Sequence, residues 1–349
     1  MNSPIRLSSS SNSSSPSPIR SPNSTIGSGI GWQAFEAVKS NAIDELRRLL
    51  NDNTNDCINY QGKDGRSPLL EASKLGYIDC LDILINVGSD IRYHDDKGRN
   101  AIIWCSINGH TNCLKMIIDE CIKDCNDLSY DINQEDDDNY TSLMWASNNG
   151  HHECVSILLS YGANIKAKQS DGLHSLMLAA YNGHHQCVSI LISVGSEIKA
   201  KDKKGNAIHA LILASEKGDT QTLRLLLACN PDIKAKNFRT GNTALHYACS
   251  NGHTDAVELL LDHGLDIKAK NLLGDTCLHM ASVNNHVDTV SLLIQRGCDI
   301  SAKNKEGDTS LMKAAMNDLI DVVNILWQHT PDIDRECAAI KHFVIDKIT

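Results

Sequence analysis

The sequence predicts an all-α protein, a solenoid in which short helix pairs stack one on the next. Two interleaved series of glycines recur with a common period along most of the 349-residue chain. Apolar residues make up 41% of the chain but aromatic residues only 4%. The core must therefore consist mainly of Leu, Ile, Val, Ala and Cys, which suits closely stacked helices better than a β-sandwich. A repeat array also escapes the size limit of a single core.

The two glycine series mark different points of the repeated unit. The first series precedes each predicted helix pair, at Gly65, Gly98, Gly172, Gly205, Gly241, Gly274 and Gly307. Its spacings are 33, 74, 33, 36, 33 and 33 residues, and the long interval holds one more unit in which Asn139 replaces glycine. The second series lies inside each pair, at Gly76, Gly109, Gly150, Gly183, Gly218 and Gly252, with Asn285 next in phase. Two series on one period indicate repeats.

The clearest unit runs from Thr240 to Gly264 and contains G-x-T-x-L-H-x-A, then G-H, then V-x-L-L-L-x-x-G. These motifs resemble those of the ankyrin repeat, and they return closely at Gly274 to Ala281 and more loosely in the other units. The resemblance covers nearly the whole chain outside its Ser-rich head. It implies helix-turn-helix units joined by β-hairpin or loop fingers.

The repeats divide the chain into four predicted regions. Residues 1–30 form a disordered head rich in Ser and Pro. Residues 31–61 form a degenerate N-terminal unit, and residues 62–333 form about eight repeats with an insertion near 119–134. Residues 334–349 form a helix that caps the C-terminal repeat, since the end of a solenoid needs a polar outer face.

Each part of the unit has a physical explanation. Thr243 and its equivalents are expected to cap the first helix through the hydroxyl group. The glycine of the second series ends that helix in the left-handed conformation. The link Ile165 to Lys168 alternates apolar and polar residues, as the β-hairpin finger implied by the ankyrin resemblance would.

Composition and motifs exclude several functions. A net charge of −10 argues against nonspecific nucleic-acid binding. No apolar run is long enough to span a membrane, and the head has no stretch typical of a signal peptide. The 13 cysteines are therefore expected to be reduced, in the cytosol or the nucleus. No phosphate-binding loop or nucleophile motif occurs, so we predict a non-enzymatic, monomeric protein without a cofactor.

Histidines and cysteines raise the alternative of a metal or thiol sensor. His110, His184, His253 and His286 follow the turn inside a pair, and His246 and His279 belong to the first-helix motif. We expect structural hydrogen bonds from them rather than metal ligation. Four cysteines occupy one equivalent position in successive units, where stacking at about 8–10 Å is too wide for a disulfide or a shared zinc. These are Cys80, Cys113, Cys154 and Cys187. The acidic run Glu135 to Asp138 is expected to be a solvated loop.

The resemblance implies partner binding on the concave surface of the array, through the finger tips and the inner helices. The position six residues after each glycine of the first series, called the turn glycine below, is variable and apolar. We predict a stripe of contact residues at this position: Trp104, Trp145, Leu178, Tyr247 and Met280. The alternative for this stripe is burial against neighbouring helices. Tyr181 lies near the end of a first helix. The fingers carry lysine pairs that begin at Lys166, Lys199, Lys234 and Lys268. They would favour an acidic segment of a partner, or they are simply solvated.

The predicted function is that of an adaptor or scaffold that binds another protein. Two alternatives remain open: a regulatory or inhibitory subunit of an enzyme or a transcription factor, and the thiol or metal sensor. Four serines of the head precede proline and are candidate phosphorylation sites: Ser3, Ser15, Ser17 and Ser21. Phosphates on them would be able to dock on the lysines.

Overall fold

The computed structural model describes residues 29–125, 132–198 and 210–330. The four candidate phosphoserines, Lys199 and the segment 334–349 lie outside these residues. The chain divides into two compact units: Met1–Ala146 with Ser156–Asn164, and Ser147–Val155 with Ile165–Thr349. The boundary passes through the pair α8 (Ser142–Asn149) and α9 (His152–Ser160). Each unit is described by itself.

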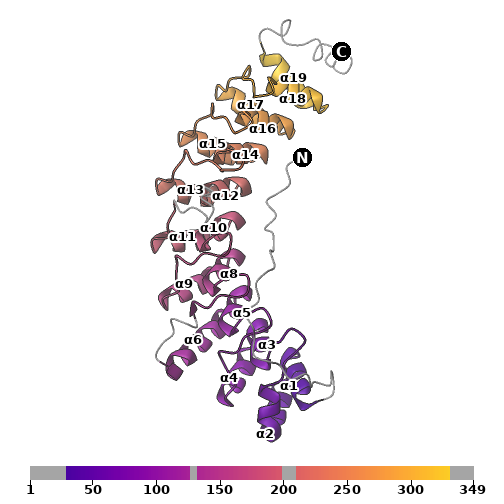
Figure 1. Ribbon diagram of the computed structural model, residues 1–349, viewed down its shortest axis with the longest axis vertical. Coiled ribbons are helices and arrows are strands. Elements are labelled where there is room, and N and C mark those ends of the chain that lie inside the picture. Colours follow the sequence, from indigo (N-terminus) through magenta and orange to yellow (C-terminus); the bar gives the residue numbers. More distant parts are fainter. Residues whose placement is uncertain (1–28, 126–131, 199–209, 331–349) are drawn as a thin grey trace. The chain divides into compact units, whose positions relative to one another are not determined.

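Within its described residues, unit 1 contains three further helix pairs, which are labelled in Figure 1. They are α1 (Ile30–Lys39) with α2 (Ile43–Ile58), α3 (Pro68–Leu75) with α4 (Ile78–Asn86), and α5 (Ala101–Asn108) with α6 (Thr111–Cys125). The first helices α1, α3 and α5 pack in succession, as do the second helices α2, α4 and α6. Helix α6 has 15 residues where α4 has nine, so part of the predicted insertion continues a helix.

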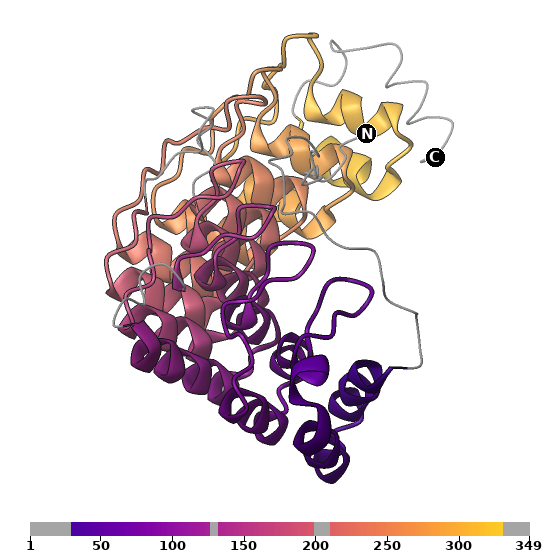
Figure 2. The same ribbon diagram turned by 60° about the horizontal axis from the view of Figure 1, so that its bottom comes forward.

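The described part of unit 2 contains five further pairs. They are α10 (Ser175–Asn182) with α11 (His185–Ser193), α12 (Ala210–Lys217) with α13 (Thr220–Ala228), α14 (Ala244–Ser250) with α15 (Thr254–Asp262), α16 (Cys277–Val283) with α17 (Val287–Gln295), and α18 (Ser310–Met316) with α19 (Ile320–His329). First helices pack on first helices and second helices on second helices. The segments that join successive pairs project from one side of the stack (Figure 2). All-α stacking is therefore confirmed.

The helix starts follow from the predicted caps. Ser67 accepts a hydrogen bond from the amide of Leu70, and Thr309 accepts one from that of Met312. Thr243 takes part in a capping box in which the third helical residue is a histidine instead of the usual Glu or Gln. These bonds satisfy amides that have no partner within the helix. The Gly76 turn has φ 75° and Asn139, the predicted glycine substitute, has φ 61°, so both adopt the left-handed conformation.

Of the two finger conformations expected, β-hairpin or loop, the described fingers adopt the loop. Among the described residues, bridge pairing occurs at one isolated position, between Glu135 and Thr141. Backbone and side-chain groups both satisfy the finger amides: the amide of Asn271 donates to the carbonyl oxygen of Asp275 at 3.0 Å, the Asp266 Oδ1 atom accepts from the amide of Lys268, and the Asn271 Oδ1 atom accepts from that of Leu273. Such local side-chain bonds compete with strand pairing, so the fingers are successive turns.

The histidines join each repeat to its neighbours, as predicted. In unit 2, the Nε2 atom of His286 donates to the carbonyl oxygen of Ser250 at 2.9 Å, at the end of the preceding first helix. In the opposite direction, the Nε2 atom of His246 donates to the carbonyl oxygen of Asp275 in the following unit at 3.1 Å. Equivalent backward bonds come from His110 in unit 1 and from His184 and His253 in unit 2. The histidine framework therefore satisfies backbone groups that the helices leave free.

Candidate protein interaction surface

A groove of about 530 Å³ lies between two neighbouring fingers of unit 2. One finger carries Lys234 and Lys236, the other carries Lys268 and Lys270, and all four lysines line the groove. The apolar lining comes from the fingers and from the end of the pair α14–α15: Ile233, Leu265 and Ala269. Among the described lining residues the only carboxylate is that of Asp266. The groove is thus basic in a protein whose net charge is −10.

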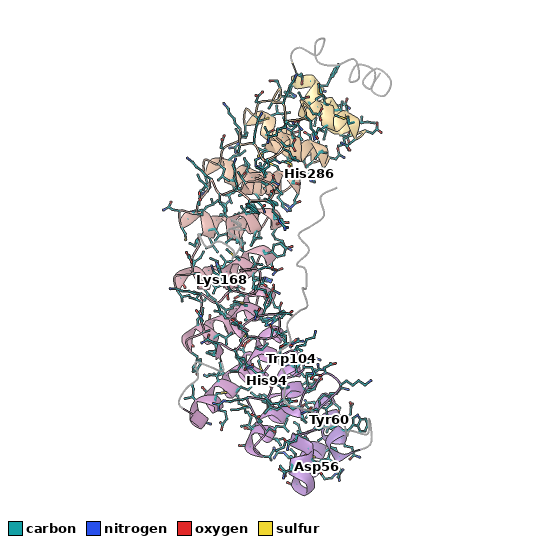
Figure 3. The ribbon with its side chains drawn as sticks, viewed as in Figure 1. Asp56, Tyr60, His94, Trp104, Lys168 and His286 are labelled. Atoms are coloured by element: carbon teal, nitrogen blue, oxygen red, sulfur yellow. The ribbon has the colours of Figure 1, made fainter. Side chains whose placement is uncertain are left out.

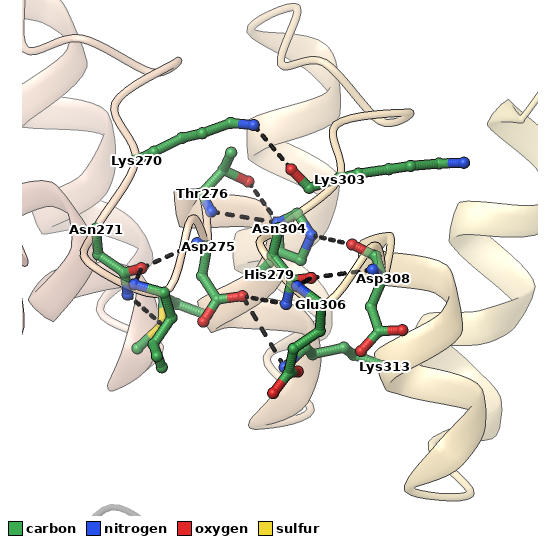
Figure 4. Close-up of polar contacts among 12 residues, drawn as sticks. Lys270, Asn271, Asp275, Thr276, His279, Lys303, Asn304, Glu306, Asp308 and Lys313 are labelled. Carbon is green, nitrogen blue, oxygen red and sulfur yellow. Dashed lines mark hydrogen bonds and ion pairs between the residues drawn. The ribbon is translucent and has the colours of Figure 1, made fainter.

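The two lysines of each pair have different surroundings. The Nζ atom of Lys236 donates to the carbonyl oxygen of Lys270 at 3.1 Å, and that of Lys270 donates to the carbonyl oxygen of Lys303 at 2.8 Å. Figure 4 shows the second of these bonds. The second lysines therefore tie one finger to the next. All four lysines are exposed. Within the described part of the chain, Lys234 and Lys268 do not make such a bond between fingers, so their ammonium groups remain available in the groove.

The stripe predicted six residues after the turn glycine is largely buried. Leu178 is 1% exposed and Met280 is 6% exposed, both in unit 2. Such side chains belong to the core and leave a partner almost nothing to touch. Tyr247 and Tyr181, also in unit 2, are half-buried and keep surface that a partner can reach. Lys166, in the first described finger of unit 2, is exposed.

In unit 1, Trp104, which is labelled in Figure 3, is 7% exposed and lies within a cluster of charged side chains. Its Nε1 atom donates to the Oδ2 atom of Asp95 at 3.1 Å. Three cations lie over the indole, with distances to the ring centroid of 4.5 Å for Arg99, 5.5 Å for Arg66 and 5.6 Å for Lys74. Carboxylates pair with these cations, including Glu71 at 2.7 Å from Arg66. Trp104 is therefore an internal anchor of unit 1.

Trp145 is half-buried and packs against Tyr140, with the ring centroids 4.7 Å apart. Its Nε1 atom donates to the Oδ2 atom of Asp136 at 2.9 Å. Asp136 is itself buried and also accepts from the amides of Tyr140 and Asp138. The prediction that the whole acidic run is solvated is therefore wrong at Asp136. Burial raises the pKa of this carboxyl group, although the three hydrogen bonds oppose the shift.

A family profile described as "Ankyrin repeats (3 copies)" matches residues 34–128, 121–202, 176–271 and 266–337, well over half of the chain. The chain belongs to the ankyrin-repeat family. Its structure is similar to the crystal structure of the human ASB11 ankyrin repeat domain, with a TM-score of 0.59 and 24% sequence identity, over 67% of this chain and 99% of that one. At this identity the likeness shows the ankyrin fold alone.

The chain is also similar in sequence to the Target of rapamycin complex 2 subunit AVO2 of Saccharomyces cerevisiae. The two sequences are 36% identical over 63 residues, which are 18% of this chain and 15% of that protein. The chain thus matches less than a fifth of that relative's length. Ankyrin repeats are generally modules for protein–protein interaction, and this coarse statement holds for the chain.

Three exposed apolar residues of this ankyrin array were missed by sequence reasoning. Phe238 is 64% exposed, Leu272 is 52% exposed and Leu273 is 63% exposed. They lie at the tips of the two fingers that form the basic groove. A signal for them exists in the sequence, because the other fingers have Asp, Ser, Lys or Glu at the two positions before the glycine, or Asn139, that precedes each helix pair.

Cys80, Cys113 and Cys187, three of the four cysteines at the repeat-equivalent position, have the inert character expected of them. Those that the structure describes are free thiols, and most of them are buried. Burial raises the pKa of Cys113 to about 11 and that of Cys187 to about 12. Within the described ranges no cluster of three His, Cys, Asp or Glu side chains is arranged to hold a metal ion. The search for membrane spans covered the described helices and found none with enough length and apolar character.

Proposed function

We propose that the chain is a non-enzymatic adaptor or scaffold that binds another protein through the fingers of unit 2. The observation that carries this proposal is the groove between the two fingers, with four lysines and one carboxylate in its lining. A partner that supplies an acidic segment would gain charge complementarity there. The free thiols of the described cysteines support a reducing compartment, the cytosol or the nucleus.

Each ion pair between a groove lysine and an acidic partner is expected to add little binding free energy, and the lysines act mainly as a set. An exposed ion pair contributes about 0.2–1 kcal/mol, so Lys234 and Lys268 would each add little. Their placement side by side instead favours fast encounter with an acidic surface and discrimination against basic ones. The backbone of both fingers is held by side-chain bonds from Asp232 and Asp266, so little ordering is needed on binding.

A second candidate is a regulatory or inhibitory subunit of an enzyme or a transcription factor. The curated relative named as a subunit of a complex supports membership in a larger assembly, over the short region that the two proteins share. Both candidates use the same groove. They differ in whether the captured partner has an activity that the chain changes.

The test is affinity capture from native lysate with the full chain and two charge-reversed variants. Lys234→Glu with Lys268→Glu reverses the groove, and Lys63→Glu with Lys97→Glu makes the same change in exposed fingers of unit 1. Partners that the wild type and the control retain, and that the groove variant loses, would support the proposal. Identical sets of captured proteins for all three chains would contradict it.

A further inference from the structure

The two fingers that form the basic groove also carry large exposed apolar side chains at their tips. Phe238 follows Lys236 by two residues, and Leu272 and Leu273 follow Lys270 directly after Asn271. The exposed fractions of these side chains, 52–64%, are high for such residues. A contiguous apolar patch on a protein surface is typical of a binding site, whereas single exposed residues are common.

The tips are fixed next to one another by backbone hydrogen bonds. The amide of Leu272 donates to the carbonyl oxygen of Thr240 in the preceding finger at 2.9 Å. The Leu272 side chain lies over Gly241, where an added Cβ atom would be 2.9 Å from its Cγ atom. Asn237 and Asn271 hold the two turns, since their Oδ1 atoms accept from the amides of Arg239 and Leu273. The apolar side chains therefore project from an ordered platform.

We infer that the partner segment is an acidic polypeptide that also carries bulky apolar side chains, which pack on Phe238, Leu272 and Leu273 while its carboxylates face Lys234 and Lys268. This inference rests on the proposed function and adds the apolar half of the recognition. The four lysines of the groove favour an acidic binding partner. The apolar tips favour a polypeptide over a nucleic acid, because side chains such as Leu and Phe bury well against them and phosphates do not.

The experiment measures the binding of two fluorescein-labelled peptides to the full chain by anisotropy. The first peptide intersperses Phe and Leu among Asp and Glu residues, and the second replaces each Phe and Leu by Ser. The tip variant combines Phe238→Ser, Leu272→Ser and Leu273→Ser. A second tip variant, Phe238→Ser with Leu273→Ser, keeps the Leu272 contact with Gly241 in case the triple variant is poorly folded. Met316→Ser, at an apolar residue 65% exposed at the end of α18, is the matched control.

We expect the tip variants to weaken binding of the first peptide about tenfold, the effect of burying part of a few apolar side chains. Binding of the second peptide should not change, and Met316→Ser should behave as the wild type. The groove variant Lys234→Glu with Lys268→Glu should weaken binding of both peptides. Wild-type affinity of both tip variants for the first peptide would overturn the inference while leaving the basic groove intact.

Three further outcomes would also overturn the inference. If the groove variant bound both peptides with wild-type affinity, the proposed function of the basic groove would be contradicted, and the inference that depends on it would fail. A single-stranded oligonucleotide that displaces the first peptide, and binds the tip variants less tightly than the wild type, would assign the tips to a nucleic acid. Sedimentation that shows a wild-type dimer and monomeric tip variants would assign them instead to a second copy of this chain.

Discussion

The Nε2 atom of His279 donates a 3.1 Å hydrogen bond to the carbonyl oxygen of Asp308 in the next repeat (Figure 4). On the other side of the ring, Nδ1 accepts from the amide of Thr276 at 3.2 Å and contacts its Oγ1 atom at 2.9 Å. These partners require the neutral ring with the proton on Nε2. Burial accordingly lowers the pKa of His279, although the Asp308 bond opposes the shift. One side chain thus caps its own helix and holds the next repeat.

Replacing this histidine should weaken unit 2. His279→Ala leaves the amide of Thr276 and the carbonyl of Asp308 without their partner, which should cost about 2–4 kcal/mol of unfolding free energy. Urea unfolding followed by far-UV circular dichroism measures the loss. His263→Ala is the control, because that exposed side chain bonds only within its own helix, to the carbonyl of Leu259. Equal stabilities of the two variants would contradict the linking role.

Stability should fall in mild acid because of His174. This residue occupies the cap position of α10, is 3% exposed, and neither ring nitrogen has a hydrogen-bond partner among the described residues. Burial, with a smaller effect of Lys168, lowers its pKa from 6.5 to about 4. Between these values the unfolded chain binds the proton and the folded chain does not, so unfolding becomes easier as pH falls. The loss should reach about 3 kcal/mol.

His174→Asn tests this assignment, since asparagine cannot titrate and is a good helix cap. Urea unfolding across the interval from pH 6.5 to about 4 should show a shallower loss for the variant than for the wild type. Acidic residues contribute equally to both chains and therefore cancel in the difference. Parallel profiles would mean that His174 is already protonated, or is solvated, in the folded protein.

A matched pair of glycines separates backbone strain from close packing. Gly252 has φ 71°, and a Cβ atom there would collide with the ring of His286, whereas Gly264 has φ 81° and open space. Gly264→Ala should cost about 1–2 kcal/mol, the penalty of the left-handed conformation. Gly252→Ala should cost about 1–3 kcal/mol more, because the histidine must also move. Thermal unfolding compares the two, and similar losses would mean that His286 is easily displaced.

Trp104 should act through stability rather than through surface contact. Trp104→Ala removes a buried indole and should cost unit 1 about 3–5 kcal/mol. Trp104→Phe keeps most of the apolar volume but loses the bond to Asp95, so its loss should be smaller. Urea unfolding followed by far-UV circular dichroism avoids dependence on tryptophan emission. If the Trp104→Ala chain were as stable as the wild type but no longer bound the partner protein, Trp104 would be a contact residue after all.

The buried thiols of Cys113 and Cys187 should resist alkylation. Because burial raises the pKa of Cys113 and Cys187 to about 11 and about 12, few of these thiols are ionised at neutral pH. Iodoacetamide labelling with site-resolved mass spectrometry should modify the half-buried Cys229 in the native protein, and Cys113 and Cys187 only in urea. Native labelling of Cys113 or Cys187 at the rate of Cys229 would favour a thiol sensor.

The helix caps, turns and histidine contacts of the repeats were predicted well, because each depends on residues that are close together in the sequence. A glycine or asparagine with positive φ, a hydroxyl that caps a helix and a histidine beside a turn are each recognisable from a few neighbouring residues. The finger conformation was not predicted, because alternation of apolar and polar residues fits both a strand and a series of turns closed by Asp and Asn side chains. Exposure was not predicted either: equivalent positions hold the half-buried Tyr247 and the buried Leu178.

The sequence by itself determined that this chain is an ankyrin solenoid, since a fixed period of helix caps, turns and apolar faces admits few other folds. Only the tertiary structure decided which residues face solvent. A side chain six residues after the turn glycine is buried or accessible according to what the adjacent repeat places against it. The alignment of four lysines with Phe238, Leu272 and Leu273 likewise depends on two fingers being held together by bonds such as that from Leu272 to Thr240.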